Sequence, residues 1–130
     1  MSGAHASSAQ PGGPGLELTC RQVGDDVLVI TVAGDLDMAT AAQARAYLQD
    51  RTAARPRHLV LDLTGVEFMG SHGVSLLVDA HEGRDGIHGR LHLTGVSSNR
   101  PVERALDVTG LTPLLDIHDD QDRLVRALTR

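Results

Sequence analysis

A serine and a histidine stand side by side in a short polar turn near the middle of the chain, Met69-Gly70-Ser71-His72-Gly73. A serine at a strand-to-helix turn could be a nucleophile, and a neighbouring histidine could be its base. The nucleophile elbow of hydrolases has glycine two residues before the serine, however, and this chain has Met69 there. Side chains that are adjacent at a helix start also point in different directions. The pattern therefore favours Ser71 as a helix N-cap beside a solvent-facing His72.

Two acidic residues, Asp35 and Asp37, lie one residue apart in a segment typical of a loop. Paired carboxylates could act as general acid and base, but at this spacing in a loop they are more often turn formers and solvated charges. Gly65 and Gly70 are five residues apart, as in a P-loop, but Ser71 stands where the phosphate-contacting lysine should be. Neither acid–base catalysis nor nucleotide binding is favoured.

The seven histidines raise the question of a metal site. His88 and His92 are four residues apart, and on an extended segment they would lie about 13 Å apart, too far to share an ion. His81-Glu82 lacks the second histidine of an HExxH motif. The single cysteine excludes a multi-cysteine zinc site and an intrachain disulfide. We therefore expect scattered surface histidines, no metal and no cofactor.

The composition argues against two classes of partner. The chain has 130 residues, a formal charge of −5 and two aromatic residues, Tyr47 and Phe68. Binding to nucleic-acid phosphates relies on Lys and Arg, and stacking on bases relies on aromatic rings, so we expect no nucleic acid as partner. No apolar run approaches the roughly 20 residues that span a bilayer, so we expect no membrane either. We predict a cytoplasmic protein.

The chain divides into a short tail and one domain. Residues 1–15 are rich in Gly, Pro, Ser and Ala and lack the apolar segment of a secretory signal, so we predict a disordered tail, followed by a single domain over residues 16–130. Within the domain, apolar runs predict strands, and capping residues with helical periodicity predict helices. The expected strands are Leu16–Val23, Val27–Ala33, His58–Leu63, Arg90–Val96 and Leu114–Ile117. The expected helices run from Thr40 to about Thr52, from Ser71 to Gly83, from about Pro101 to Gly110, and after Asp119-Asp120.

Three details concern the helix starts and faces. Thr40 and Gln43 have the spacing of a capping box. The segment Thr64–Phe68 is predicted as a linker between strand and helix. In the helix that follows, the apolar face is expected to consist of Val74, Leu77, Val78 and His81.

The element order is ββαβαβαβα, with about four helices. This alternation implies an α/β fold with a mixed, mainly parallel sheet and an antiparallel strand at its N-terminal end. Binding sites of such sheets lie at the carboxyl ends of the strands. We expect three loops to meet there: Gly34 to Met38, Phe68 to Gly73, and Ser97 to Asn99.

Three segments of the sequence together resemble one family. They are Gly34-Asp35-Leu36-Asp37 with Thr40, the stretch from Leu59 to Val74 (LVLDLTGVEFMGSHGV), and Asn99-Arg100-Pro101-Val102 through Thr109-Gly110-Leu111. The pattern resembles the STAS domain, and more narrowly the bacterial anti-sigma factor antagonists, over residues 16 to about 128. The resemblance implies the STAS fold and a non-enzymatic role in transcription regulation. It also implies binding to a kinase-like anti-sigma factor, which releases a sigma factor.

The turn departs from the pattern of this family. There it usually reads Asp-Ser-Ser/Thr-Gly, and the Ser or Thr before the Gly is phosphorylated by the partner kinase. Here Gly70 occupies the Asp position and His72 the phosphoacceptor position, whereas Ser71 and Gly73 match. We expect that the docking surface is kept and the phospho-switch is lost or altered, with Ser71 as a possible substitute acceptor.

The resemblance predicts a partner-binding surface where the three loops are expected to meet. Its residues are Asp35, Leu36, Asp37, Met38, Met69, Gly70, Ser71, His72, Gly73, Val74, Ser75, Ser98 and Asn99. We expect a monomer or weak dimer. An alternative is a ligand-sensing or scaffold STAS module in a signalling complex, and a small hydrolase using Ser71 is a third, disfavoured possibility.

Overall fold

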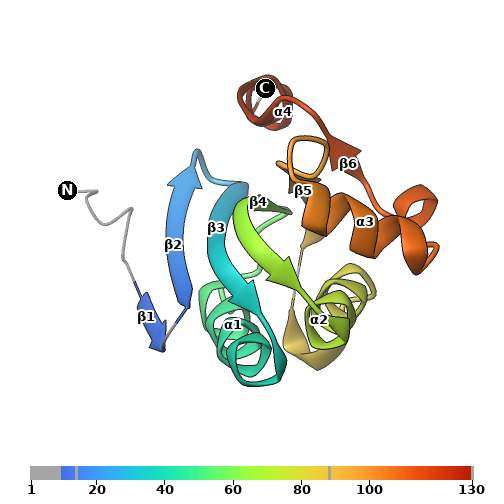
Figure 1. The fold of residues 1–130 in the computed structure, drawn as a ribbon. Coiled ribbons are helices and arrows are strands. Elements are labelled where there is room, and N and C mark those ends of the chain that lie inside the picture. The colour runs from blue at the N-terminus through green and yellow to red at the C-terminus, as the bar shows by residue number, and fades with distance from the viewer. Residues whose placement is uncertain (1–9, 14, 88, 130) are drawn as a thin grey trace.

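The computed structural model describes residues 10–13, 15–87 and 89–129. Six strands form one sheet in the order β1-β2-β3-β4-β5-β6 (Figure 1). The strands are β1 Gln10–Gly13, β2 Leu16–Val23, β3 Val27–Leu36, β4 His58–Met69, β5 Arg90–Thr94 and β6 Ile117–His118. The helices are α1 Met38–Arg51, α2 Ser71–His81, α3 Arg100–Val108 and α4 Gln121–Leu128, with 3-10 turns η2 Arg84–Gly86 and η3 Thr112–Leu114.

The sheet is mixed, as predicted. Strands β1, β2 and β3 pair antiparallel, and β3 to β6 pair parallel. From Leu16 onward the element order is ββαβαβαβα, which confirms the predicted α/β class. The predicted tail differs in part, because Gln10–Gly13 adds a strand through backbone pairing with β2, which its side-chain composition does not indicate. Residues 1–9 lie outside the described part of the chain.

Each face of the sheet has its own apolar cluster. The larger cluster contains buried residues of α1, α2 and α3, such as Leu48, Leu77 and Leu106, packed on the sheet. The smaller cluster joins Val27, Val29 and Val60 of the sheet to Leu124 and Val125 of α4. Three helices therefore cover one face and α4 covers part of the other (Figure 1).

Strand β4 is longer than its apolar run suggests. Thr64–Phe68 was predicted as a linker, but it belongs to β4, because this segment continues to pair with β3 as far as the partners Leu36 and Met69. Two register shifts interrupt the ladder on the way. The extra length carries the turn beyond the main part of the sheet.

Two helix N-caps were predicted at the wrong residue. The capping box of α1 uses Asp37 as N-cap and Thr40 as its third helical residue, so Thr40 is not the N-cap. The N-cap of α2 is Gly70, which makes no side-chain cap hydrogen bond, and Ser71 is already helical. In both cases the N-cap is the residue that directly follows the strand.

The buried face of α2 and the last strand also differ from the prediction. The buried residues of α2 are Gly73, Leu76, Leu77 and Ala80, whereas His81 is exposed. The predicted face was shifted by about one residue because the helix docks through its glycine. Near the C-terminus the predicted strand over Leu114–Ile117 is a 3-10 turn followed by β6.

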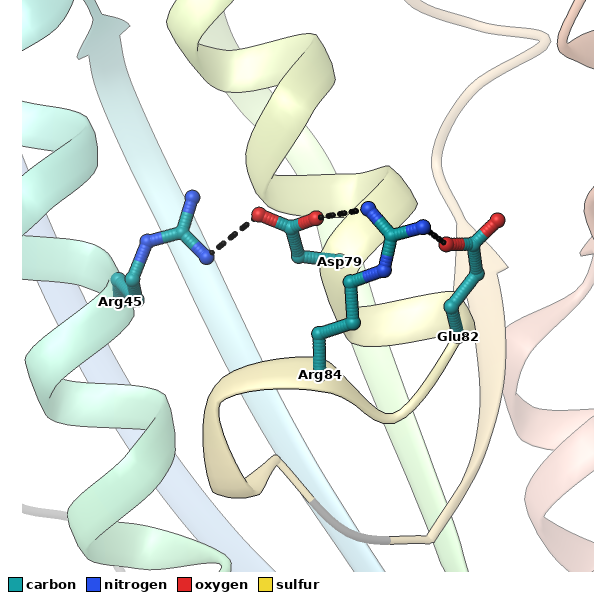
Figure 2. A network of polar contacts seen from close by, with 4 residues as sticks. All are labelled: Arg45, Asp79, Glu82 and Arg84. Carbon is teal, nitrogen blue, oxygen red and sulfur yellow. Dashed lines mark hydrogen bonds and ion pairs between the residues drawn. The ribbon is translucent and has the colours of Figure 1, made fainter.

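Helices α1 and α2 are linked by charged side chains (Figure 2). Arg45 of α1 lies 2.9 Å from Asp79 of α2, and Arg84 lies 3.4 Å from the other oxygen of Asp79. Arg84 also pairs with Glu82. The network joins the middle of α1 to the C-terminal end of α2 and holds the two helices side by side.

Candidate functional site

The ends of β3 and β4 bring two of the three predicted loops together. Asp35 and Leu36 are in register with Phe68 and Met69, and the Gly70 N–H donates to the Leu36 carbonyl at 3.1 Å. The starts of α1 and α2 therefore lie next to each other at the carboxyl edge of the sheet (Figure 1). This is the place where parallel sheets bind ligands and partners.

The start of α2 presents polar side chains to solvent. Ser71, His72 and Ser75 are exposed, Val74 is half-buried and Gly73 is buried. A Cβ added at Gly73 would lie 2.9 Å from Leu36 Cβ and 3.1 Å from Met69 Cγ. Glycine at this position therefore lets the helix approach β3 closely and turns the preceding residues outward.

The start of α1 presents Met38, whose side chain is 68% exposed. The Asp37 carboxylate accepts from the Thr40 backbone N–H at 3.0 Å, and the Thr40 hydroxyl accepts from the Asp37 N–H at 2.8 Å. The Thr40 backbone N–H, and after it the Thr40 hydroxyl, which also donates to the carboxylate at 3.0 Å, lower the pKa of Asp37. Asp37 thus orders the loop, and Met38 beside it is free to contact a partner.

The third predicted loop does not reach the turn. Asn99 is buried and donates to three carbonyls of β4, those of Leu63, Thr64 and Val66, at 2.9, 3.2 and 2.7 Å. Its side-chain oxygen accepts from the Val102 N–H and caps α3. Since β4 ends at Met69, three residues after Val66, this loop contacts the strand roughly 10 Å before its end. Ser98 is exposed there, and Asn99 positions β4 without facing solvent.

Helix α3 replaces that loop as the neighbour of the turn. An open groove of about 520 Å³ is lined by Glu67, Phe68 and Met69 on one side and by Arg100, Pro101, Arg104, Ala105 and Val108 on the other. Phe68 is 51% exposed and Val108 is 79% exposed. The surface predicted from the sequence did not include Phe68 or Val108. A signal was available, since Phe68 is one of only two aromatic residues in the chain and stands directly before the turn.

The prediction that the histidines are scattered over the surface was wrong for three of them. His58, His92 and His118 gather on the face of the sheet that α4 covers only in part, together with Asp116. The prediction compared only histidines close in sequence, whereas the sheet brings neighbouring strands together. Burial lowers the pKa of His92, and the Asp116 carboxylate acts in the opposite direction.

The sequence and the fold both match known proteins. The STAS domain family matches residues 21–123. The chain is 31% identical over 104 residues to an anti-sigma F factor antagonist of Paenibacillus polymyxa, covering 79% of this chain and 85% of that one. It is 30% identical over 92 residues to an anti-sigma-B factor antagonist of Listeria monocytogenes, covering 71% and 79%. The crystal structure of an anti-sigma factor antagonist from Mycobacterium paratuberculosis has a TM-score of 0.74 at 25% identity, covering 95% of this chain and all of that one.

The chain belongs to the STAS domain family. The relatives named above group it with the bacterial anti-sigma factor antagonists of that family. The resemblance seen in the sequence is thereby confirmed, and so is the fold class. Within the described ranges, no helix is long and apolar enough to cross a membrane.

Proposed function

We propose that this chain is a cytoplasmic, non-enzymatic anti-sigma factor antagonist that binds a kinase-like anti-sigma factor and so releases a sigma factor. The names of its relatives support the general role. The observation that carries the proposal is the exposed strip formed by the adjoining starts of α1 and α2. Its outward side chains are Asp37, Met38, Phe68, Ser71, His72 and Ser75.

The strip has the chemistry of a protein-binding surface. Met38 and Phe68 are large, exposed apolar side chains, and such anchors carry most of the energy of an interface when a partner buries them. Arg100, Arg104 and Glu67 line the adjoining groove and supply charges at its edge. Of the originally predicted surface, Leu36, Met69, Gly73 and Asn99 are buried and act by holding the exposed residues in place.

We infer further that the usual phospho-switch is lost or altered. His72, the second residue of α2, occupies the phosphoacceptor position and has no hydroxyl group. A phosphate adds a charge of about −1.5 to −2, which at a fitted interface repels acidic groups and must be desolvated. Without an acceptor hydroxyl at this position, the partner kinase has no means of ending the complex there. Ser71 is exposed one residue earlier and is the candidate substitute.

The proposal is tested by incubating the chain with ATP and a kinase-like anti-sigma factor encoded near it, followed by intact-mass analysis. We expect a stable complex by size-exclusion chromatography and no gain of one phosphate in mass. A complex with stoichiometric phosphorylation would show that the switch is retained, and Ser71→Ala would then identify the acceptor. Absence of any complex would contradict the role itself.

A variant that restores the phosphoacceptor tests the same turn in the opposite direction. Gly70→Asp with His72→Ser recreates the family pattern, and we expect a kinase that phosphorylates related antagonists to phosphorylate it. A Cβ at Gly70 would lie 3.1 Å from the ring of Phe68, which is half-exposed and can move aside. The matched control is Gly70→Asp alone, which lacks the hydroxyl and should stay unmodified. If the double variant folds but takes no phosphate, residues outside the turn contribute to the loss.

A further inference from the structure

Two histidines, one on β5 and one on β6, and the aspartate that directly precedes β6 point their ring and carboxylate atoms at one another. His92 Nδ1 lies 3.0 Å from one oxygen of Asp116, and His118 Nε2 lies 3.0 Å from the other. All three potential ligand atoms lie within 4.8 Å of each other. Asp116 and His118 are two residues apart at β6, so both side chains face the same side of the sheet. His92 joins them from the neighbouring strand.

The two ring nitrogens face Asp116 but make no well-directed hydrogen bond with it. Both are enclosed, and neither makes a hydrogen bond, although each is at ion-pair distance from Asp116. The His92 side chain is only 4% exposed. Buried nitrogen atoms without hydrogen bonds are rare in proteins and call for an explanation, of which a bound ion is one.

We propose that His92, Asp116 and His118 form a binding site for a divalent transition-metal ion, with Zn²⁺ as the ion of choice. Two imidazoles and one carboxylate are a donor set that zinc accepts, with the remaining position open to water. Bonds of about 2.0–2.1 Å place tetrahedral ligands about 3.3 Å apart. The side chains of Asp116 and His118 are 34% and 33% exposed, so they have room to close to that spacing.

His58 supplies the support that a metal-ligating histidine usually has. Its Nδ1 lies 3.1 Å from Nε2 of His92, the nitrogen that faces away from Asp116. If His92 binds metal through Nδ1, its proton resides on Nε2 and is donated to His58, which fixes the ring orientation.

Arg90 is a charged group beside the site that opposes a cation. Its Nη2 lies 3.5 Å from the same Asp116 oxygen that His92 approaches, and its side chain is 71% exposed. An arriving ion would displace it into solvent. Removing this guanidinium should therefore tighten metal binding, a direction that general damage to the protein would not produce.

The site is far from the turn and does not depend on the proposed function. His92 is in register with Val60, nine residues before Met69 on β4, which corresponds to roughly 30 Å along the strand. A failure of metal binding would leave the role of the turn unaffected, and the reverse also holds.

The experiment is titration of the full, chelator-treated chain with Zn²⁺ by calorimetry, and with Co²⁺ by visible absorption. We expect one ion per chain and a rise in Tm that grows with ln(1 + [Zn²⁺]/Kd). His118→Ala and Asp116→Asn should each weaken binding by more than about 100-fold, and His58→Ala by about 10–100-fold, as for a supporting partner. Arg90→Gln should strengthen it.

The control is His81→Ala, which removes an exposed histidine of α2 away from the cluster. It should bind Zn²⁺ like the original chain. The inference is overturned if no ion binds, or if binding is the same in Asp116→Asn and His118→Ala as in the control. Circular dichroism of each variant checks that the compared chains are folded. If His118→Ala unfolds, Asp116→Asn still tests the site, because asparagine has nearly the same shape as aspartate.

Discussion

Gly73 lies where α2 comes closest to β3. The Cβ of any other residue would meet Leu36 Cβ at 2.9 Å and Met69 Cγ at 3.1 Å, and both neighbours are buried. Neither can move away without disturbing the core. At the scale of single residues, this contact sets how far the exposed serine and histidine before it stand out from the sheet.

Gly73→Ala should therefore destabilise the chain by about 1–3 kcal/mol, the usual cost of overpacking. Urea unfolding measures the change. Ser75→Ala, at an exposed position of the same helix, should change stability by less than about 0.5 kcal/mol. Equal stability of the two variants would show that α2 shifts outward without cost.

Asp37 makes a pH-dependent contribution to the stability of the folded state. Hydrogen bonds from Thr40 hold its pKa below the ordinary value of 3.8. Because the folded state favours the ionised form, its contribution is complete above pH 3.8 and is lost as the pH falls through the lowered pKa. Asp37→Asn keeps a capping oxygen but cannot ionise.

We expect the urea midpoints of the original chain and Asp37→Asn to converge as the pH falls from about 5 to about 2. Asp25→Asn, in the exposed turn between β2 and β3, serves as the comparison and should show no such convergence. A constant difference for Asp37→Asn would mean that the charge is not what stabilises the cap.

Asn99 connects two elements at once. Its amide nitrogen binds three carbonyls of β4 at the point where the ladder with β3 is irregular, and its oxygen caps α3. At the scale of elements, this side chain attaches α3 to the extended half of β4. The groove beside the turn depends on that attachment, because α3 forms its second wall.

Two substitutions at this position separate the hydrogen bonds to β4 from the helix cap. Asn99→Ala should cost about 2–4 kcal/mol, since it removes the cap and leaves buried carbonyls unpaired. Asn99→Ser retains a capping hydroxyl and should recover only about 1 kcal/mol of that loss. Thermal or urea unfolding measures both. If Asn99→Ser were as stable as the original chain, the bonds to β4 would contribute nothing.

At the scale of the whole molecule, the proposed partner-binding strip lies at one edge of the sheet and the histidine cluster on the face near α4. Phe68 is half-exposed in the strip, so a partner that covers it gains the burial of an aromatic side chain. Phe68→Ala should weaken binding to the anti-sigma factor by about 30-fold or more, equivalent to about 2 kcal/mol. Stability should change little.

Calorimetric titration with the partner measures the effect. Leu114→Ala is the matched control, because Leu114 is 64% exposed and does not line the groove. The control should bind like the original chain. If both variants bound equally well, the partner would contact another surface, and the proposal that the strip binds the partner would be contradicted.

The sequence by itself determined the features that depend on local order. Apolar runs and capping residues predicted the strands and helices from Leu16 onward, and three sequence segments identified the family, because both signals lie within short stretches of chain. The departure at Gly70 and His72 was visible in the same way. These properties need no knowledge of which strand lies beside which.

Tertiary structure decided everything that depends on neighbours distant in sequence. The pairing of β3 with β4 extended the strand through Thr64–Phe68, so that Gly70, which directly follows it, is the N-cap of α2. Packing against β4 buried Asn99, and strand order brought His92 to Asp116 and His118 across more than twenty intervening residues. Such contacts arise from the register of the sheet, a long-range property that no local pattern of residues encodes.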